Sequence, residues 1–181
     1  MPFFGGGAGD YLIVGTNIKG STSAAPATVG TNNMALGNAS LQGLTVGSNN
    51  IAIGNSASST LLNGSNNTFI GYNSGKNLVT NTSNTISIGY NSFFNAGGTA
   101  SVVIGNVACG FGTITNVSSS VVLGYSAQYN DNSIAHSVVI GSGAFLGGLV
   151  PGATITQAVA VGDNASAQNQ GVAQRSRGGG G

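Results

Sequence analysis

Charged residues are almost absent from this chain. Its 181 residues include no Glu and no Trp, and charged side chains make up 4% of the sequence, where about 25% is usual for a globular domain. The net charge of +1 offers no basic surface, so we expect neither nucleic acid nor an anionic membrane as a partner. A disordered chain would be charged and poor in aliphatic residues, whereas 40% of this chain is hydrophobic.

Groups that could support catalysis or metal binding are equally scarce. His136 is the single histidine, and Asp131 and Asp163 fall at different positions of the repeat described below. Acid–base and nucleophilic chemistry need ionisable groups that converge, and the glycine- and aspartate-rich phrase of calcium-binding β-helices is missing. We therefore expect no enzymatic activity, no cofactor and no metal.

Features of membrane and exported proteins are also missing. No run approaches the roughly 20 apolar residues that span a bilayer, so we expect no membrane insertion. The start, Met1–Gly7, lacks the basic segment and apolar core of a signal peptide. The single cysteine, Cys109, cannot form an internal disulfide, and we expect its thiol to be buried or half-buried. These observations predict a product of the cytoplasm that is assembled into a larger structure.

The chain does contain a short phrase that occurs eight times. The phrase is two or three apolar residues, a glycine, a polar residue and then a small residue, and consecutive glycines lie 16 to 21 residues apart. A period of this length predicts a solenoid whose function depends on its shape and surface. The repeat glycines are Gly37, Gly54, Gly71, Gly89, Gly105, Gly124, Gly141 and Gly162.

Positions in the repeat are numbered here from its glycine. Apolar, mostly β-branched residues occupy positions −3 and −1, as in Ile51 and Ile53, which predicts a strand with both side chains facing inward. The glycine is expected to need a positive φ or to lack room for a Cβ atom. Small residues at position +3 indicate a tight corner. Asparagines at positions −5 and −4, such as Asn49 and Asn50, suit a left-handed corner and can form ladders.

Together these positions predict an all-β fold, a parallel β-solenoid of about eight coils with two short strands per coil. Such a thin core is marginal on its own. We expect several aromatic residues on exposed flat faces, and protomers that bury these faces against one another as a homo-oligomer. These aromatic residues are Phe69, Phe93, Phe94 and Phe145.

The repeat divides the chain into three parts. Residues 1–30 are expected to be an N-terminal attachment or capping segment, 31–168 the repeat domain, and 169–181 a flexible glycine-rich tail. The candidate residues for docking to a particle are Phe3, Phe4, Tyr11, Leu12 and Ile13.

Three tyrosines share position +1 of the repeat, directly after the glycine. Stacked coils would bring Tyr72, Tyr90 and Tyr125 into one column. Tyrosine suits recognition because it buries area and keeps a polar tip, so these residues are candidates for a recognition surface. Packing at a corner or between oligomers is the alternative role.

The phrase at 50–57, Asn-Ile-Ala-Ile-Gly-Asn-Ser-Ala, resembles the head repeat of YadA-type trimeric autotransporter adhesins. The phrase at 67–75 equally resembles the fibre repeats of bacteriophage tail proteins. Both resemblances imply a left-handed parallel β-roll that forms a homotrimer, either intertwined or side by side. The repeats here are longer than the adhesin head unit, and no stalk, anchor or signal peptide is recognisable, which favours the virion interpretation.

The sequence therefore predicts a structural virion protein of a bacteriophage-like particle. It would be a trimeric fibre, spike or surface decoration that contacts other virion proteins through its N-terminal segment. Its expected task is attachment to a glycan or protein of the host surface. The alternative is the head domain of a bacterial trimeric adhesin, located at the cell surface.

Overall fold

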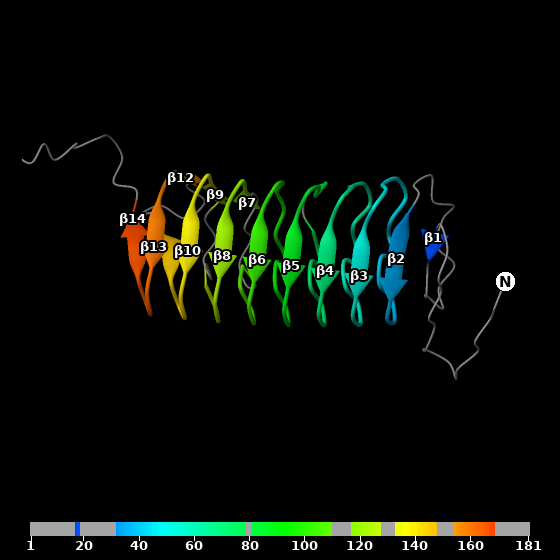
Figure 1. Ribbon diagram of the computed structural model, residues 1–181, viewed down its shortest axis with the longest axis horizontal. Coiled ribbons are helices and arrows are strands. Elements are labelled where there is room, and N and C mark those ends of the chain that lie inside the picture. The colour runs from blue at the N-terminus through cyan, green and yellow to red at the C-terminus, as the bar shows by residue number, and fades with distance from the viewer. Residues whose placement is uncertain are drawn as a thin grey trace, which may run out of the picture.

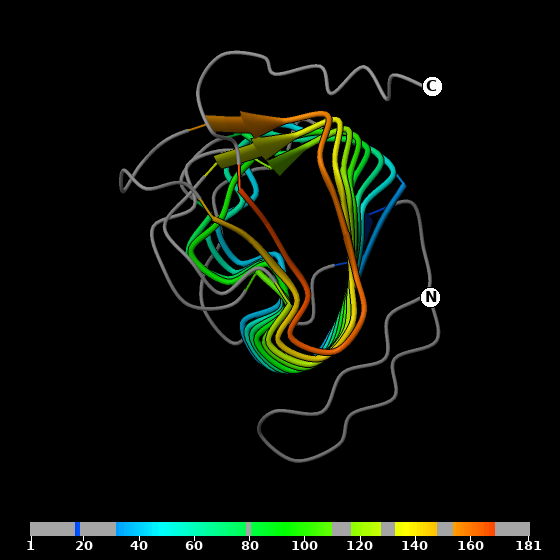
Figure 2. The same ribbon diagram turned by 90° about the vertical axis from the view of Figure 1, so that its left-hand side faces the viewer.

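The computed structural model of this protein describes residues 17–18, 32–78, 81–109, 117–127, 133–147 and 154–168. These residues form an all-β, parallel β-solenoid of about six turns. Figure 1 shows its strands side by side along the long axis, and Figure 2 shows the turns superposed as a closed loop. In the described part of the chain, no helix is long and apolar enough to cross a membrane.

The repeated phrase forms one continuous parallel sheet of nine strands. Each phrase pairs in register with the next, so that Val102 lies opposite Val121 and Ile104 opposite Leu123. The parallel strands that we predicted from the phrase are thus confirmed. In sheet order the strands are β1 (Asn17–Ile18), β2 (Asn33–Leu36), β3 (Ile51–Ile53), β4 (Thr68–Ile70), β5 (Ile86–Ile88), β6 (Val102–Ile104), β8 (Val121–Leu123), β10 (Val138–Ile140) and β13 (Val159–Val161).

The sheet continues into the segment assigned to attachment or capping. Asn17 of β1 lies opposite Asn33 of β2, and Ile18 lies opposite Met34. Residues 17–18 therefore occupy a further position on the solenoid, ahead of the first phrase. The rest of residues 1–30, with the five candidate docking residues, lies outside the described residues, as does the tail at 169–181.

The two strands expected per coil are present in only some of the described turns, because the number of strands per turn changes along the solenoid. The C-terminal turns add strands on one or two further sides: β7 (Val117–Ser118), β9 (Ser133–Ala135) and β12 (Thr154–Thr156) form one sheet, and β11 (Phe145–Gly147) pairs with β14 (Ser166–Gln168). In the N-terminal turns, isolated bridges such as Val46–Asn63 take the place of these strands. Residues with a positive φ there, including Leu41 and Ser58, bend the chain where a strand would need extended backbone.

The prediction that positions −3 and −1 face inward is wrong. The buried residue is the one between them, at position −2, where Phe69 and Val122 are fully buried and Ala160 is 3% exposed. Position −4, on the same face of the strand, is also buried and mostly polar. We assigned the more apolar face to the interior, but polar residues fill much of the interior here because they hydrogen-bond from turn to turn. The position −2 residues are Ala35, Ala52, Phe69, Ser87, Val103, Val122, Val139 and Ala160.

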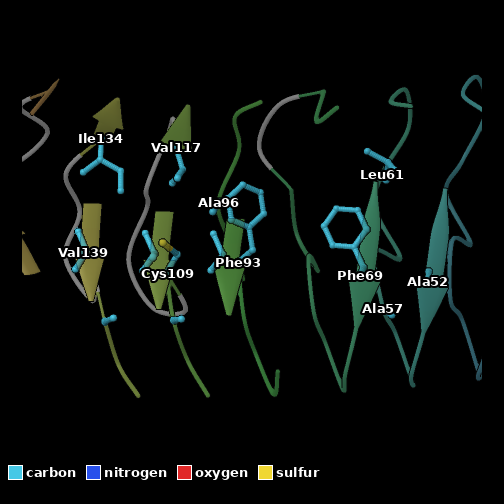
Figure 3. Packing of buried hydrophobic residues seen from close by; sticks show 14 of the residues in the cluster. Ala52, Ala57, Leu61, Phe69, Phe93, Ala96, Cys109, Val117, Ile134 and Val139 are labelled. Atoms are coloured by element: carbon cyan, nitrogen blue, oxygen red, sulfur yellow. The ribbon is translucent and has the colours of Figure 1, made fainter. Parts of the chain in front are cut away.

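The placement of two phenylalanines on an exposed face is also wrong. Phe69 and Phe93 are the largest fully buried side chains of the described residues, and Figure 3 shows both among the core side chains. Phe69 is at position −2 and therefore points inward. Gly75 makes room for its ring, because a Cβ on Gly75 would collide with that ring. Phe94 is partly buried.

The repeat glycine satisfies two constraints at once. Gly37 has a φ of +131°, and a Cβ built on it would lie 2.5 Å from the carbonyl oxygen of Gly54 in the next turn. Every repeat glycine has a positive φ between 128° and 143°. The carbonyl of Gly54 also accepts a hydrogen bond at 3.3 Å from the N–H of Ala57, the small residue at position +3. The repeat glycine, the sharp corner that follows it and the close stacking of the turns therefore depend on one another.

Candidate functional site: a tyrosine column beside an aliphatic face

Hydrogen bonds between turns fix the backbone at the tyrosines of position +1. The N–H of Asn91 donates to the carbonyl of Tyr72 at 2.9 Å, and the N–H of Val107 donates to that of Tyr90 at 2.8 Å. The Tyr125 carbonyl accepts a bond at 2.8 Å from Gly143. Each tyrosine is thus fixed from the following turn. We call the eight position +1 residues the tyrosine column: Asn38, Asn55, Tyr72, Tyr90, Asn106, Tyr125, Ser142 and Asp163.

The side chains of this column point to solvent. Tyr72, Tyr90 and Tyr125 are 47%, 50% and 61% exposed. The rings of Tyr72 and Tyr90 are stacked, with their centroids 5.4 Å apart and their planes inclined by 11°. This separation is close to the roughly 4.8 Å spacing of neighbouring parallel strands, so the stack follows the solenoid axis. The structure brings these two predicted residues together, and Tyr125 follows two turns later in the same column.

The surroundings of the tyrosines are polar and nearly uncharged. Asn55 precedes the stacked pair in the column, Asn106 separates Tyr90 from Tyr125, and both asparagines are exposed. Among the described residues, Lys76 is the one Lys or Arg and Asp163 is the one carboxylate. The column can therefore offer aromatic faces and amide hydrogen bonds, but little electrostatic attraction for an ion.

An apolar surface runs along the main sheet. Its residues precede the tyrosine column in the sequence of each repeat. It consists of positions −3 and −1, fifteen of whose sixteen residues are Ile, Val, Leu or Met. Val159 and Val161 are 64% and 60% exposed, Ile86 and Ile104 about 40%, and the others are half-buried between their neighbours. We call this surface the aliphatic face: Met34, Leu36, Ile51, Ile53, Thr68, Ile70, Ile86, Ile88, Val102, Ile104, Val121, Leu123, Val138, Ile140, Val159 and Val161.

Our sequence reasoning missed the aliphatic face because it placed these residues in the core. The signal that identifies it is the polar residue at position −4, which shares a strand face with position −2. If Asn50 and Asn67 are read as an internal ladder, the alternation of the strand places Ile51 and Ile53 outside. Hydrophobicity alone favours the opposite assignment.

The described residues contain no group of three or more His, Cys, Asp or Glu side chains that could hold a metal ion. Cys109 is buried, as we expected, and burial raises the pKa of its thiol far above the ordinary range. The thiol is therefore protonated at neutral pH, and a protonated thiol is not a nucleophile. This arrangement gives Cys109 a packing role.

No protein-family model, curated protein or solved structure matches the chain. The resemblance of its phrases to adhesin heads and phage fibres therefore remains a prediction from the sequence.

Proposed function

We propose that this protein is a structural, non-enzymatic component of a bacteriophage-like particle. In this proposal the chain forms a homotrimeric fibre, spike or surface decoration, with residues 1–30 docked to other virion proteins and the solenoid projecting toward the host surface. The left-handed sense of the roll and the trimeric state come from the resemblance of the repeated phrase to fibre and adhesin repeats, and the number of about eight coils comes from the eight repeats.

The aliphatic face is the observation that carries this proposal. It contains no charged residue over the whole length of the main sheet, and eight strands at about 4.8 Å make it on the order of 40 Å tall. Monomeric proteins rarely expose an apolar surface of this continuity. A second copy of the same face is a complementary partner, because parallel solenoids present the same apolar columns along their full length.

Assembly through this face favours the interpretation of the protein as a fibre over its interpretation as a protein that binds a ligand in a pocket. Three solenoids with their aliphatic faces toward a common axis would bury the apolar columns and leave the polar corners outside. The shared core would compensate for the thin core of each protomer. Such a rod would also present every position of the repeat in three copies, which suits attachment to a repetitive surface.

Light scattering on the full-length protein tests the assembly. We expect a mass close to three times 17.6 kDa. Replacing Ile86 and Ile104 together by Glu should prevent trimerisation, whereas replacing the exposed residues Asn38 and Asn55 by Glu should leave the mass unchanged. A wild-type monomer would contradict the proposal, and so would an equal response of the two double variants.

Location on a particle tests the virion role. Labelled antibody against the chain should mark a defined site on purified particles in electron microscopy. Removal of residues 1–16 eliminates all five candidate docking residues and leaves β1 in place, so this truncated chain should still trimerise but no longer join particles. Labelling of a bacterial surface in place of particles would support the adhesin alternative and contradict the virion role.

A further inference from the structure

The order of residues in the tyrosine column leaves a gap between two aromatic rings. Tyr72 and Tyr90 occupy successive turns and stack on each other. The next turn carries Asn106, and the turn after it carries Tyr125. Tyr72 stacks on one face of the Tyr90 ring, and Asn106 and Tyr125 follow on the opposite side of Tyr90 in the column. The much shorter Asn106 therefore lies at the base of a slot whose walls are Tyr90 and Tyr125.

The width of this slot follows from the spacing of the turns. Two turns at about 4.8 Å place the Tyr90 and Tyr125 positions about 10 Å apart. A flat ring needs about 3.5–4 Å to each aromatic face for van der Waals contact. A single six-membered ring therefore fits between the two side chains, whereas the stack of Tyr72 on Tyr90 leaves no such space.

The chemistry of the slot selects the kind of ring. The aromatic walls favour the C–H-bearing face of a sugar, because the π face carries partial negative charge. The Asn106 amide at the base can both donate and accept hydrogen bonds, as sugar hydroxyls require. A nucleic acid would need a basic track along its backbone, and Lys76 is the one Lys or Arg among the described residues. The same scarcity of cations disfavours sialylated or phosphorylated sugars.

We propose that the slot formed by Tyr90, Asn106 and Tyr125 binds one pyranose ring of a neutral glycan. This inference rests on the proposed function, because it names the ligand class for host attachment. Hydrogen bonds from the following turns fix the backbone at Tyr90 and Tyr125, so the spacing of the two positions is set before the ligand arrives, which lowers the entropic cost of binding. In a trimer the slot would occur three times, so modest affinity at each slot would give strong attachment to a repetitive polysaccharide.

The experiment uses the full-length protein on an array of neutral oligosaccharides and their sialylated counterparts, followed by calorimetry with the best neutral glycan. Tyr90→Ala and Tyr125→Ala should each weaken binding at least about tenfold, as loss of a central aromatic anchor does. Asn106→Tyr should abolish binding by filling the slot with a third stacked ring. The fold should tolerate this change, since tyrosine already occupies position +1 in three other turns.

Asn55→Tyr is the matched control. It adds a tyrosine to the same column on the far side of Tyr72, outside the slot, and affinity should stay within about twofold of wild type. Equal binding by Asn106→Tyr and wild type would overturn the inference. Preference for sialylated glycans, binding of aromatic peptides in place of sugars, or failure to bind any glycan would do so as well.

Light scattering on each variant separates ligand binding from subunit contact. If Asn106→Tyr or Tyr90→Ala changes the mass of the assembly, the column is a contact between copies and the inference is wrong. The same experiments distinguish failure of this inference from failure of the proposed function. A trimer on particles that binds no neutral glycan would overturn the slot alone, whereas slot-dependent binding by a protein absent from particles would overturn the virion role alone.

Discussion

The side-chain amide of Asn50 donates a hydrogen bond at 3.0 Å to Oδ1 of Asn33, one turn earlier in the solenoid. The same amide donates to the carbonyl of Gly64 at 2.8 Å, and Oδ1 of Asn50 accepts bonds at 3.1 and 2.9 Å from the backbone and side chain of Asn67. Asn50 is fully buried. Its polar side chain is therefore a fully bonded part of the interior.

We expect Asn50→Ala to destabilise the protein by about 3 kcal/mol or more, because the N–H of Asn67 and the carbonyl of Gly64 lose their partner on the Asn50 side chain. Asn50→Ser should cost less, since serine occupies position −4 in later turns, where Ser120 Oγ accepts a bond at 3.2 Å from the N–H of Ser137. Urea unfolding measures both. The exposed Asn38→Ala should stay within about 0.5 kcal/mol of wild type, and a similar loss at Asn38 and Asn50 would contradict the ladder's role.

Two neighbouring valines test which face of the strand is internal. Val122 is fully buried and Val121 is half-buried on the aliphatic face. Val122→Asp should prevent folding, because it places an unpaired charge in the core. Val121→Asp should leave a folded chain that no longer trimerises. Circular dichroism and light scattering distinguish the outcomes, and the reverse result would restore the inward assignment of position −3.

The close stacking of repeat glycines predicts a position-dependent cost for alanine. A Cβ on Gly124 would collide with the carbonyl of Gly141, whereas a Cβ on Gly162 would lie 3.6 Å from the Cβ of Ala165, an ordinary contact. Both glycines have a positive φ. We expect Gly162→Ala to cost about 1–2 kcal/mol from backbone strain alone, and Gly124→Ala to cost more than about 4 kcal/mol. Thermal unfolding of the pair should show this difference, and equal costs would argue against the collision.

The buried thiol predicts a specific dependence of stability on pH. Burial raises the pKa of Cys109 in the folded protein, while the unfolded thiol ionises near its ordinary value of about 8.5. Above that pH the unfolded state binds fewer protons than the folded state, so stability falls as pH rises. The loss between about pH 8.5 and about pH 9.5 should be about 1 kcal/mol.

Urea unfolding across this pH range measures that loss, and Cys109→Ala should remove it. Iodoacetamide should leave Cys109 unmodified in the folded protein at about pH 8 and alkylate it in denaturant. Rapid alkylation of the folded protein would contradict the burial of this thiol.

Periodicity identified the strands, because a strand such as Ile51–Ile53 repeats its pattern in every turn and pairs in register with the next. It could not tell which face of the strand is inside. Alternation is symmetric between faces, and hydrophobicity favoured Ile51 and Ile53 over the buried Asn50 and Ala52. The tyrosine column was predictable, because register fixes which residues share a position. The slot was not, because it depends on the stacking of Tyr72 on Tyr90 and on the exposure of Tyr125.

Because the strands of the main sheet pair in register, the length of this molecule can change by whole turns. Each turn forms hydrogen bonds with its immediate neighbours. The N–H of Gly71 donates to the carbonyl of Ile53, and the N–H of Gly89 donates to the carbonyl of Ile70. Duplication or loss of one whole repeat, from one glycine to the next, would preserve the pattern of these junctions and change the length of the rod by about 4.8 Å. A lineage carrying this fold can therefore vary the reach of the rod in small equal steps without redesigning its cross-section.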